Sequence, residues 1–182
     1  LLDATEKFGS PLYVYDSDKI KRQYNKLKNS FSSVKSLQIN YAVKALSNIS
    51  ILKFIINLGS GIDAVSIQEV KLALKCGVKP DKIIYTPNGV SMDEIKKASE
   101  LGVKINIDNL SVLEDFGNNN PSIPICIRIN PHIMAGGNSK ISVGHIDSKF
   151  GISIHQIPHL IRIVNNTKIK VNGIHMHTGS DI

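Results

Sequence analysis

Six strand-like apolar runs in this chain each end in a short polar cluster, and the first cluster, residues 41–45, contains Lys44. An ε-amino group that is partly removed from water has a lowered pKa and becomes a nucleophile toward aldehydes. The alternating run before Lys44 predicts that the side chain lies at the mouth of the assembled strands, where it would be partly buried. Lys44 is therefore the candidate nucleophile, and an ordinary solvated lysine is the alternative.

The other five polar clusters follow later strand-like runs. They occupy residues 63–66, 86–89, 106–109, 128–131 and 175–180. Chemistry gathered at the carboxyl ends of successive strands is how a (β/α) barrel builds an active site. The pattern therefore favours an enzyme.

Asp63 ends the second strand-like run, which in a barrel lies beside the strand that leads to Lys44. A carboxylate in that position could pair with the lysine ammonium and hold it in place. A helix N-cap role for Asp63 or Ser66 is an equally open interpretation.

Arg128 lies inside an otherwise apolar run, residues 125–130, and is one of three arginines in the chain. A buried guanidinium requires anionic or multiple acceptor partners, so Arg128 is a candidate site residue. Lys149 closes a long polar loop, residues 131–149. It could return a second cation to the strand ends, or could cap the next element.

His175 and His177 alternate on one strand, so both face the same side, and Gly179 and Ser180 follow directly. An imidazole beside a Gly-Ser turn suits stacking on a planar ring, with the hydroxyl and backbone N–H groups bonding a phosphate. Two histidines at this spacing could also bind zinc, but no matching carboxylate or cysteine cluster is evident. A core histidine is the remaining alternative.

Strand-like and helical segments alternate from residue 36 onward, which predicts a mostly parallel sheet. The expected strands are 37–43, 62–65, 82–86, 103–107, 124–129 and 171–177. The expected helices are 48–58, 67–76, 91–101, 109–116 and 154–165. An open sheet usually carries a glycine-rich turn after its first strand, and no GxGxxG is present, so a barrel is favoured.

Helix ends are also marked in the sequence. Ser91 and Glu94 form a predicted capping box, in which the Glu94 carboxylate reaches back to the N-cap. Glycines that suit a left-handed C-cap follow four helical stretches. They are Gly59, Gly77, Gly102 and Gly117.

A complete barrel takes eight βα units in roughly 250 residues, and this chain of 182 residues has six expected strands and five helices. We therefore expect residues 36–182 to be the first part of a barrel, without its last units. Residues 1–35 are expected to form a lead-in strand at 8–15 and a helix.

Composition excludes several other classes of protein. With 42% hydrophobic and 20% charged residues, the chain has an ordinary globular composition. No apolar run approaches the roughly 20 residues that cross a bilayer, and no signal pattern opens the chain, so a cytoplasmic protein without membrane contact is expected. The net charge is +7, but the lysines are scattered rather than clustered, which argues against nucleic-acid binding. Cys76 and Cys126 lack metal spacing and are expected to be buried free thiols.

Five motifs in register resemble the alanine-racemase-like pyridoxal phosphate enzymes, and within them the diaminopimelate decarboxylase family. The motifs are YAVKA at 41–45, GIDAVS at 61–66, RINPH at 128–132, SKFGI at 148–152 and GIHMHTGS at 173–180. The resemblance runs over nearly the whole chain. It implies the barrel of a two-domain enzyme that is completed by a C-terminal β-domain and acts as a homodimer.

The resemblance also implies roles for individual residues. Lys44 would form the internal Schiff base with pyridoxal phosphate, and His177 would stack on the pyridine ring. Gly179 and Ser180 would bind the phosphate. Asp63 would contact Lys44, Arg128 would lie near the phenolic oxygen of the cofactor, and Lys149 would be the loop lysine near the active site.

The implied reaction is decarboxylation of meso-diaminopimelate to L-lysine and CO₂, the last step of lysine biosynthesis. In this reaction the cofactor supplies the organic chemistry and the protein supplies orientation and electrostatics. Two alternatives stay open. The first is a related ornithine, arginine or carboxynorspermidine decarboxylase, and the second is a pyridoxal phosphate-binding protein without turnover.

Overall fold

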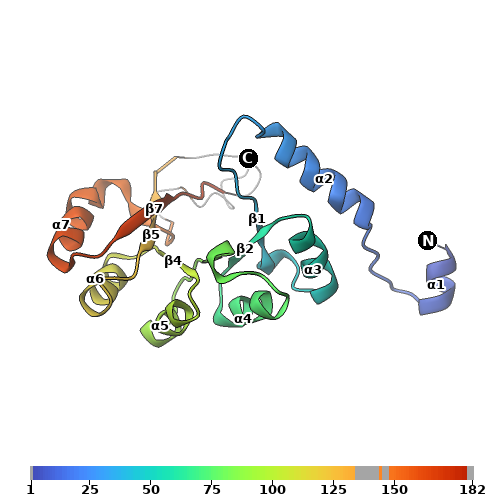
Figure 1. The fold of residues 1–182 in the computed structure, drawn as a ribbon, viewed down its shortest axis with the longest axis horizontal. Helices are drawn as coiled ribbons and strands as arrows, with labels where there is room; N and C mark the ends of the chain where they lie inside the picture. The colour runs from blue at the N-terminus through green and yellow to red at the C-terminus, as the bar shows by residue number, and fades with distance from the viewer. Residues whose placement is uncertain (1, 134–143, 145–147, 180–182) are drawn as a thin grey trace.

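The computed structural model describes residues 2–133, 144 and 148–179 (Figure 1). The α-helices are α1 (Leu2–Phe8), α2 (Ser17–Ser30), α3 (Ile49–Asn57), α4 (Ile67–Lys75), α5 (Met92–Glu100), α6 (Leu110–Asn119) and α7 (Ile157–Thr167). The strands are β1 (Asn40–Ala42), β2 (Gly61–Ala64), β3 (Ile83–Tyr85), β4 (Lys104–Ile107), β5 (Ile125–Asn130), β6 (Ile152–Ser153) and β7 (Val171–His175). Short 3-10 helices include η1 (Val43–Ala45), η2 (Pro80–Lys82) and η4 (Ile154–Gln156).

The strands form one parallel sheet in which neighbours follow chain order from β1 to β5. Both β7 and the short β6 then pair with β5, β7 along its first part and β6 at its end. Figure 1 shows the strands as an arc, with α3 to α7 along its outer side. This is part of a (β/α) barrel, as predicted, and all six expected strands are present. The two-residue β6 was not predicted.

Alternation along the strands separates an apolar outer face from a polar inner face. The outer-face side chains pack with the helices in one buried core. They include Ile62, Ala64, Ile83, Tyr85, Ile105, Ile107, Ile125 and Ile127. The register places the alternate residues together on the inner face. These are Ala42, Asp63, Thr86, Asn106, Cys126, Arg128 and His175. The inner face thus gathers the polar groups of the strands.

Side-chain caps begin the helices that follow the first strands. Asn48, Ser66, Ser91 and Asn109 each accept a hydrogen bond from the backbone of the next turn. Ser91 is the predicted N-cap of α5, but the second half of its capping box is wrong. The Glu94 carboxylate instead accepts hydrogen bonds from the Tyr85 hydroxyl (2.7 Å) and the Ile67 N–H (3.1 Å). A tertiary contact therefore takes this side chain away from its own helix end.

Three of the four predicted C-cap glycines have positive φ and follow helices, at Gly59, Gly77 and Gly102. Gly117 is different, because α6 continues to Asn119. A Cβ on Gly117 would lie 2.7 Å from the Thr167 Oγ1 of α7, so this glycine permits close packing of two helices.

The lead-in strand predicted at residues 8–15 is not formed among the described residues. Phe8 ends α1, which was not predicted, and residues 9–15 contain no strand. A strand needs a hydrogen-bonded neighbour, and no strand of the described residues pairs with this segment. Figure 1 shows α1 standing apart from the arc, joined to α2 by this segment. The domain boundary near residue 35 stays a prediction.

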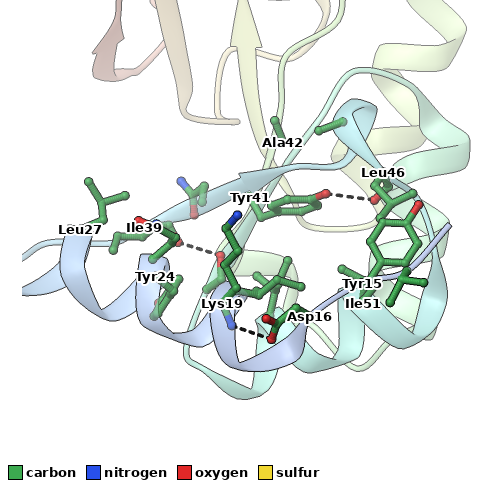
Figure 2. Close-up of a pocket in the computed structure, with 17 residues that line it drawn as sticks. Tyr15, Asp16, Lys19, Tyr24, Leu27, Ile39, Tyr41, Ala42, Leu46 and Ile51 are labelled. Atoms are coloured by element: carbon green, nitrogen blue, oxygen red, sulfur yellow. Dashed lines mark hydrogen bonds between the residues drawn. The ribbon is translucent and has the colours of Figure 1, made fainter. Parts of the chain in front are cut away.

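A hollow of about 1240 Å³ lies between α2 and the beginning of the sheet, on the opposite side of β1 from the later strands (Figure 2). It is lined mainly by apolar and aromatic side chains, and Tyr41 crosses it to donate a hydrogen bond to the Leu46 carbonyl (3.2 Å). Although this hollow is large, neither Lys44 nor either histidine of β7 and its end lines it. The candidate site therefore lies elsewhere, at the polar inner face.

Candidate active site

Lys44 lies in η1, immediately after β1 and at the carboxyl end of the sheet, as predicted. Its side chain is exposed, so the expected partial burial is wrong for the described residues. Within the same 3-10 turn, Val43 is fully buried and Lys44, the next residue, is exposed. An exposed amine at a strand end remains accessible to a carbonyl ligand.

Asp63 lies opposite Ala42 in the register of β1 and β2, which confirms that it neighbours the strand leading to Lys44. Its carboxylate accepts a hydrogen bond from the Thr86 hydroxyl (2.9 Å). Of the two N-cap candidates, Ser66 caps α4 and Asp63 does not. The pairing of Asp63 with Lys44 remains a prediction.

The Asp63 contact continues as a chain of polar side chains across the inner face. The Asn106 amide nitrogen lies 3.5 Å from the Thr86 hydroxyl, and the same nitrogen contacts Nδ1 of His175. Thr86 and Asn106 are buried, with 8% and 1% of their surfaces exposed. Asp63 of β2, Thr86 directly after β3, Asn106 of β4 and His175 of β7 thus form a continuous network.

Arg128 is 7% exposed and lies opposite His175 in the register of β5 and β7. Its guanidinium carbon lies 4.8 Å from the centre of the Phe150 ring, within the range of a cation–π contact. Burial lowers the pKa of Arg128, while the nearby carboxylates of Asp108 and Asp63 oppose that shift. Arg128 is therefore the buried guanidinium that its apolar run indicated, and its role in a site stays a prediction.

The two histidines experience the same surroundings. Burial is the main cause that lowers the pKa of His175, and the Arg128 charge lowers it further. Burial also lowers the pKa of His177, followed by the charges of Arg128 and Lys44. Asp63 acts in the opposite direction on both. Both imidazoles are therefore biased toward their neutral form, and both lie within electrostatic reach of Arg128.

Of the remaining predicted site residues, Gly179 and Lys149 lie within the described part of the chain and Ser180 lies outside it. Gly179 has a φ of 150°, a conformation that favours glycine, and it follows His177 at the same end of the sheet. Most of the 131–149 loop also lies outside the described residues. Lys149 is exposed and holds its ammonium 5.1 Å from the centre of the Phe150 ring, on which Arg128 also stacks. Lys149 therefore returns a cation to the strand ends, as one of its two interpretations expected.

Three contributors were not assigned a role from the sequence: Thr86, Asn106 and Phe150. Thr86 and Asn106 open polar clusters at strand ends, so their position was visible, but their mutual contacts depend on the register of the sheet.

Cys126 also faces this interior and is half-buried, as is Cys76, so their expected burial is wrong. Burial raises the pKa of the Cys126 thiol.

The donor set fits an anionic, planar aldehyde cofactor such as pyridoxal phosphate. An accessible primary amine, a buried guanidinium and an imidazole of lowered pKa occupy one end of one sheet. Gly179 adds a backbone turn without a Cβ at the same end. An amine can bond an aldehyde carbon, and the other groups suit a flat ring and a negatively charged substituent.

Comparison with known proteins agrees with this donor set. Residues 17–182 match the family described as pyridoxal-dependent decarboxylase, pyridoxal binding domain. The chain belongs to this family, which confirms the predicted cofactor, pyridoxal phosphate.

Individual relatives are similar over nearly the whole chain. The diaminopimelate decarboxylase of Methanothermobacter thermautotrophicus is 37% identical over 183 residues, which cover 100% of this chain and 43% of that protein. The structure of Helicobacter pylori diaminopimelate decarboxylase complexed with L-lysine is 34% identical with a TM-score of 0.86, covering 98% of this chain and 47% of that one. The lysine/ornithine decarboxylase of Vibrio vulnificus complexed with putrescine is 27% identical with a TM-score of 0.80, covering 98% and 45%.

This chain therefore spans less than half the length of the relatives that it matches. In the part of the chain that the structure describes, none of the helices has the length and apolar character needed to cross a membrane. Within the same part, His, Cys, Asp and Glu side chains form no group of three that could hold a metal ion.

Proposed function

We propose that the protein is a diaminopimelate decarboxylase, which converts meso-diaminopimelate to L-lysine and CO₂ as the last step of lysine biosynthesis. The observation that carries the proposal is the 37% identity to a diaminopimelate decarboxylase over the full length of this chain. The inner-face groups support it, because the predicted amine, guanidinium and imidazole gather at one end of the sheet.

Each proposed site residue has a distinct role. When bound, pyridoxal phosphate supplies an electron sink for the charge left by the departing CO₂. Lys44 would hold the cofactor covalently through its ε-amino group, which is exposed at the end of the sheet. His177, whose pKa is lowered by burial, would stack on the cofactor ring. Gly179 and Ser180 bind the phosphate.

The charged residues of the inner face orient these groups. Asp63 lies beside the strand of Lys44 and orients the lysine. Arg128 is held by its burial and by the Phe150 ring, and it would lie near the phenolic oxygen of the cofactor. Lys149, whose ammonium lies over the same ring, would place a second cation near the strand ends for a carboxylate of the substrate.

A second candidate function is decarboxylation of a related basic amino acid such as ornithine or lysine. The similarity to the Vibrio vulnificus lysine/ornithine decarboxylase favours it, with a TM-score of 0.80. The lower identity, 27% against 37%, makes it the weaker candidate. The proposed enzyme acts in the cytoplasm as a homodimer, in agreement with the implied family architecture.

A decarboxylation assay of the full-length protein tests the proposal. CO₂ release is measured with pyridoxal phosphate and with meso-diaminopimelate, ornithine, lysine or arginine as the single substrate. We expect release from diaminopimelate alone, with L-lysine as the product. Release from another of the four amino acids alone would replace the proposal by the second candidate. Binding of the cofactor without release from any of them would refute both.

A further inference from the structure

In the polar network of the inner face, the carboxylate at one end determines which group donates and which accepts each hydrogen bond. Asp63, as a carboxylate, can only accept hydrogen bonds, so the hydroxyl proton of Thr86 is committed to it. The Thr86 oxygen then presents lone pairs to Asn106. The part of the Asn106 amide that faces Thr86 must therefore be its NH₂ group.

The same NH₂ group also contacts Nδ1 of His175. An NH₂ group only donates, so Nδ1 of His175 must be the unprotonated, accepting nitrogen of the ring. The proton of the neutral imidazole then lies on Nε2. A carboxylate on β2 thus selects the tautomer of a histidine on β7, through Thr86, which follows β3, and Asn106 on β4.

We propose that His175 is a positioning residue, which Asp63 and Asn106 hold as the Nε2-protonated tautomer so that the end of β7 presents His177 to the cofactor. The part about His177 rests on the proposed function. The part about the tautomer rests on the network alone.

Burial of Asn106 allows only one orientation of its amide group. Asn106 is 1% exposed, and its Oδ1 has no hydrogen-bond partner among the described residues. Turning the amide over would place that oxygen against the Thr86 oxygen, whose only proton is already donated to Asp63. Two acceptors would then face each other away from water, which costs more than leaving Oδ1 without a donor.

The charges around His175 favour the neutral ring that this network requires. Arg128 on β5 and His177 beyond β7 face it, and burial together with these groups lowers its pKa, while Asp63 on β2 acts in the opposite direction. The ring contact with Asn106 ties the last residue of β7 to β4. His177 follows two residues later, so the contact fixes the strand end from which that imidazole projects.

Nuclear magnetic resonance of the full-length holoenzyme with ¹⁵N-labelled histidine tests the tautomer. The His175 signals are assigned by their loss in His175→Asn. We expect an unprotonated Nδ1 and a protonated Nε2 in the natural protein at pH 7.5. In Asn106→Asp, the donor to Nδ1 becomes an acceptor, and we expect Nδ1 to gain a proton.

Asn109→Asp is the matched control. It adds the same charge three residues later, at an N-cap where aspartate is as suitable as asparagine. We expect it to leave both signals unchanged. A protonated Nδ1 in the natural protein, or an unprotonated Nδ1 in Asn106→Asp, would overturn the inference. If Asn106→Asp does not fold, Thr86→Val replaces it. This variant removes the hydroxyl that orients the Asn106 amide, so we expect a mixture of the two His175 tautomers. A single Nε2-protonated form in Thr86→Val would overturn the inference.

Cofactor retention tests the positioning role. His175→Asn keeps an acceptor near the place of Nδ1, whereas His175→Leu removes it. We expect the pyridoxal phosphate affinity to fall about tenfold in His175→Leu and to be largely restored in His175→Asn, which corresponds to about 1.4 kcal/mol. Equal affinities in the two variants would refute positioning. None of these readouts depends on the amino acid decarboxylated, so a different substrate would overturn the proposed function and leave this inference standing.

Discussion

Replacing Glu94 by alanine should destabilise the protein, because one carboxylate oxygen serves two donors from different elements. Oε1 of Glu94 accepts from the hydroxyl of Tyr85, whose side chain is fully buried, and from the N–H of Ile67 at the beginning of α4. A buried donor that loses its acceptor costs about 1–3 kcal/mol. Glu94 is only half-buried, so water can reach part of the vacated space. We therefore expect the free energy of unfolding to fall by about 2–4 kcal/mol, in the lower part of the summed range.

Urea unfolding of the full-length apoprotein, followed by circular dichroism, measures this change. With a slope of about 2 kcal/mol per molar urea, the midpoint should fall by about 1–2 M. Glu94→Gln keeps the accepting oxygen and loses only the charge, so its cost should be about 1 kcal/mol. Glu100→Ala, at an exposed position of the same helix, is the control and should change the midpoint little.

A double-mutant cycle with Tyr85→Phe isolates the hydroxyl contact. Without that hydroxyl, Glu94→Ala leaves one donor unsatisfied instead of two, so its cost should be smaller by about 1–2 kcal/mol. The reasoning is refuted if Glu94→Ala lies within about 0.5 kcal/mol of the natural protein. Equal effects of Glu94→Ala and Glu94→Gln would show that charge, rather than the accepting oxygen, is what the site requires.

Three further predictions concern the active site. Lys44→Ala should abolish covalent attachment of pyridoxal phosphate, so that borohydride reduction followed by mass spectrometry finds no modified peptide; a modified peptide at another lysine would refute the assignment. His177→Ala should weaken cofactor retention more than His175→Ala, as measured by dialysis and absorbance, and the reverse order would mean that the stacking imidazole is His175. Since burial lowers the pKa of both histidines below 6.5, the unfolded chain binds more protons than the folded one as the pH falls through 6.5. Stability should therefore be lower at pH 5.5 than at 7.5 in urea unfolding, and the difference should shrink in His175→Gln; an undiminished difference would exclude His175 as its source.

The repeated strands and helices could be predicted from the sequence because their signal is local. Alternation of apolar and polar residues predicted the strands, and N-cap residues such as Ser91 marked helix beginnings. Elements without such a signal were missed or wrong. The two residues of β6 are too few to show alternation, and the apolar residues near 8–15 suggested a strand that has no neighbour in the described structure.

The contacts within the site could be predicted only in part. The carboxyl ends of the strands were correct places to look, and Lys44, Asp63 and Arg128 were found there from residue type and position. The link from Thr86 to Asn106 could not be found, because it depends on how β3 and β4 are aligned in the sheet. The same limit explains Glu94, whose local pattern indicated a cap while partners 9 and 27 residues earlier in the chain take its carboxylate.

The pairing of β7 with β5 implies that this strand joins the sheet later in folding than the strands before it. Asn40 pairs with a residue 21 positions later, and the following strands pair at nearly the same separation, whereas Ile125 pairs with Val171, 46 positions later. Doubling the length of a closed loop costs about 0.6 kcal/mol of chain entropy, and contacts between distant residues form slowly. Strands β1 to β5 can therefore assemble stepwise from short segments, while β7, with His175 and the following His177, joins the sheet last. Amide protection in pulse-labelled refolding should appear in β2 to β4 before β7, and simultaneous protection would contradict this order.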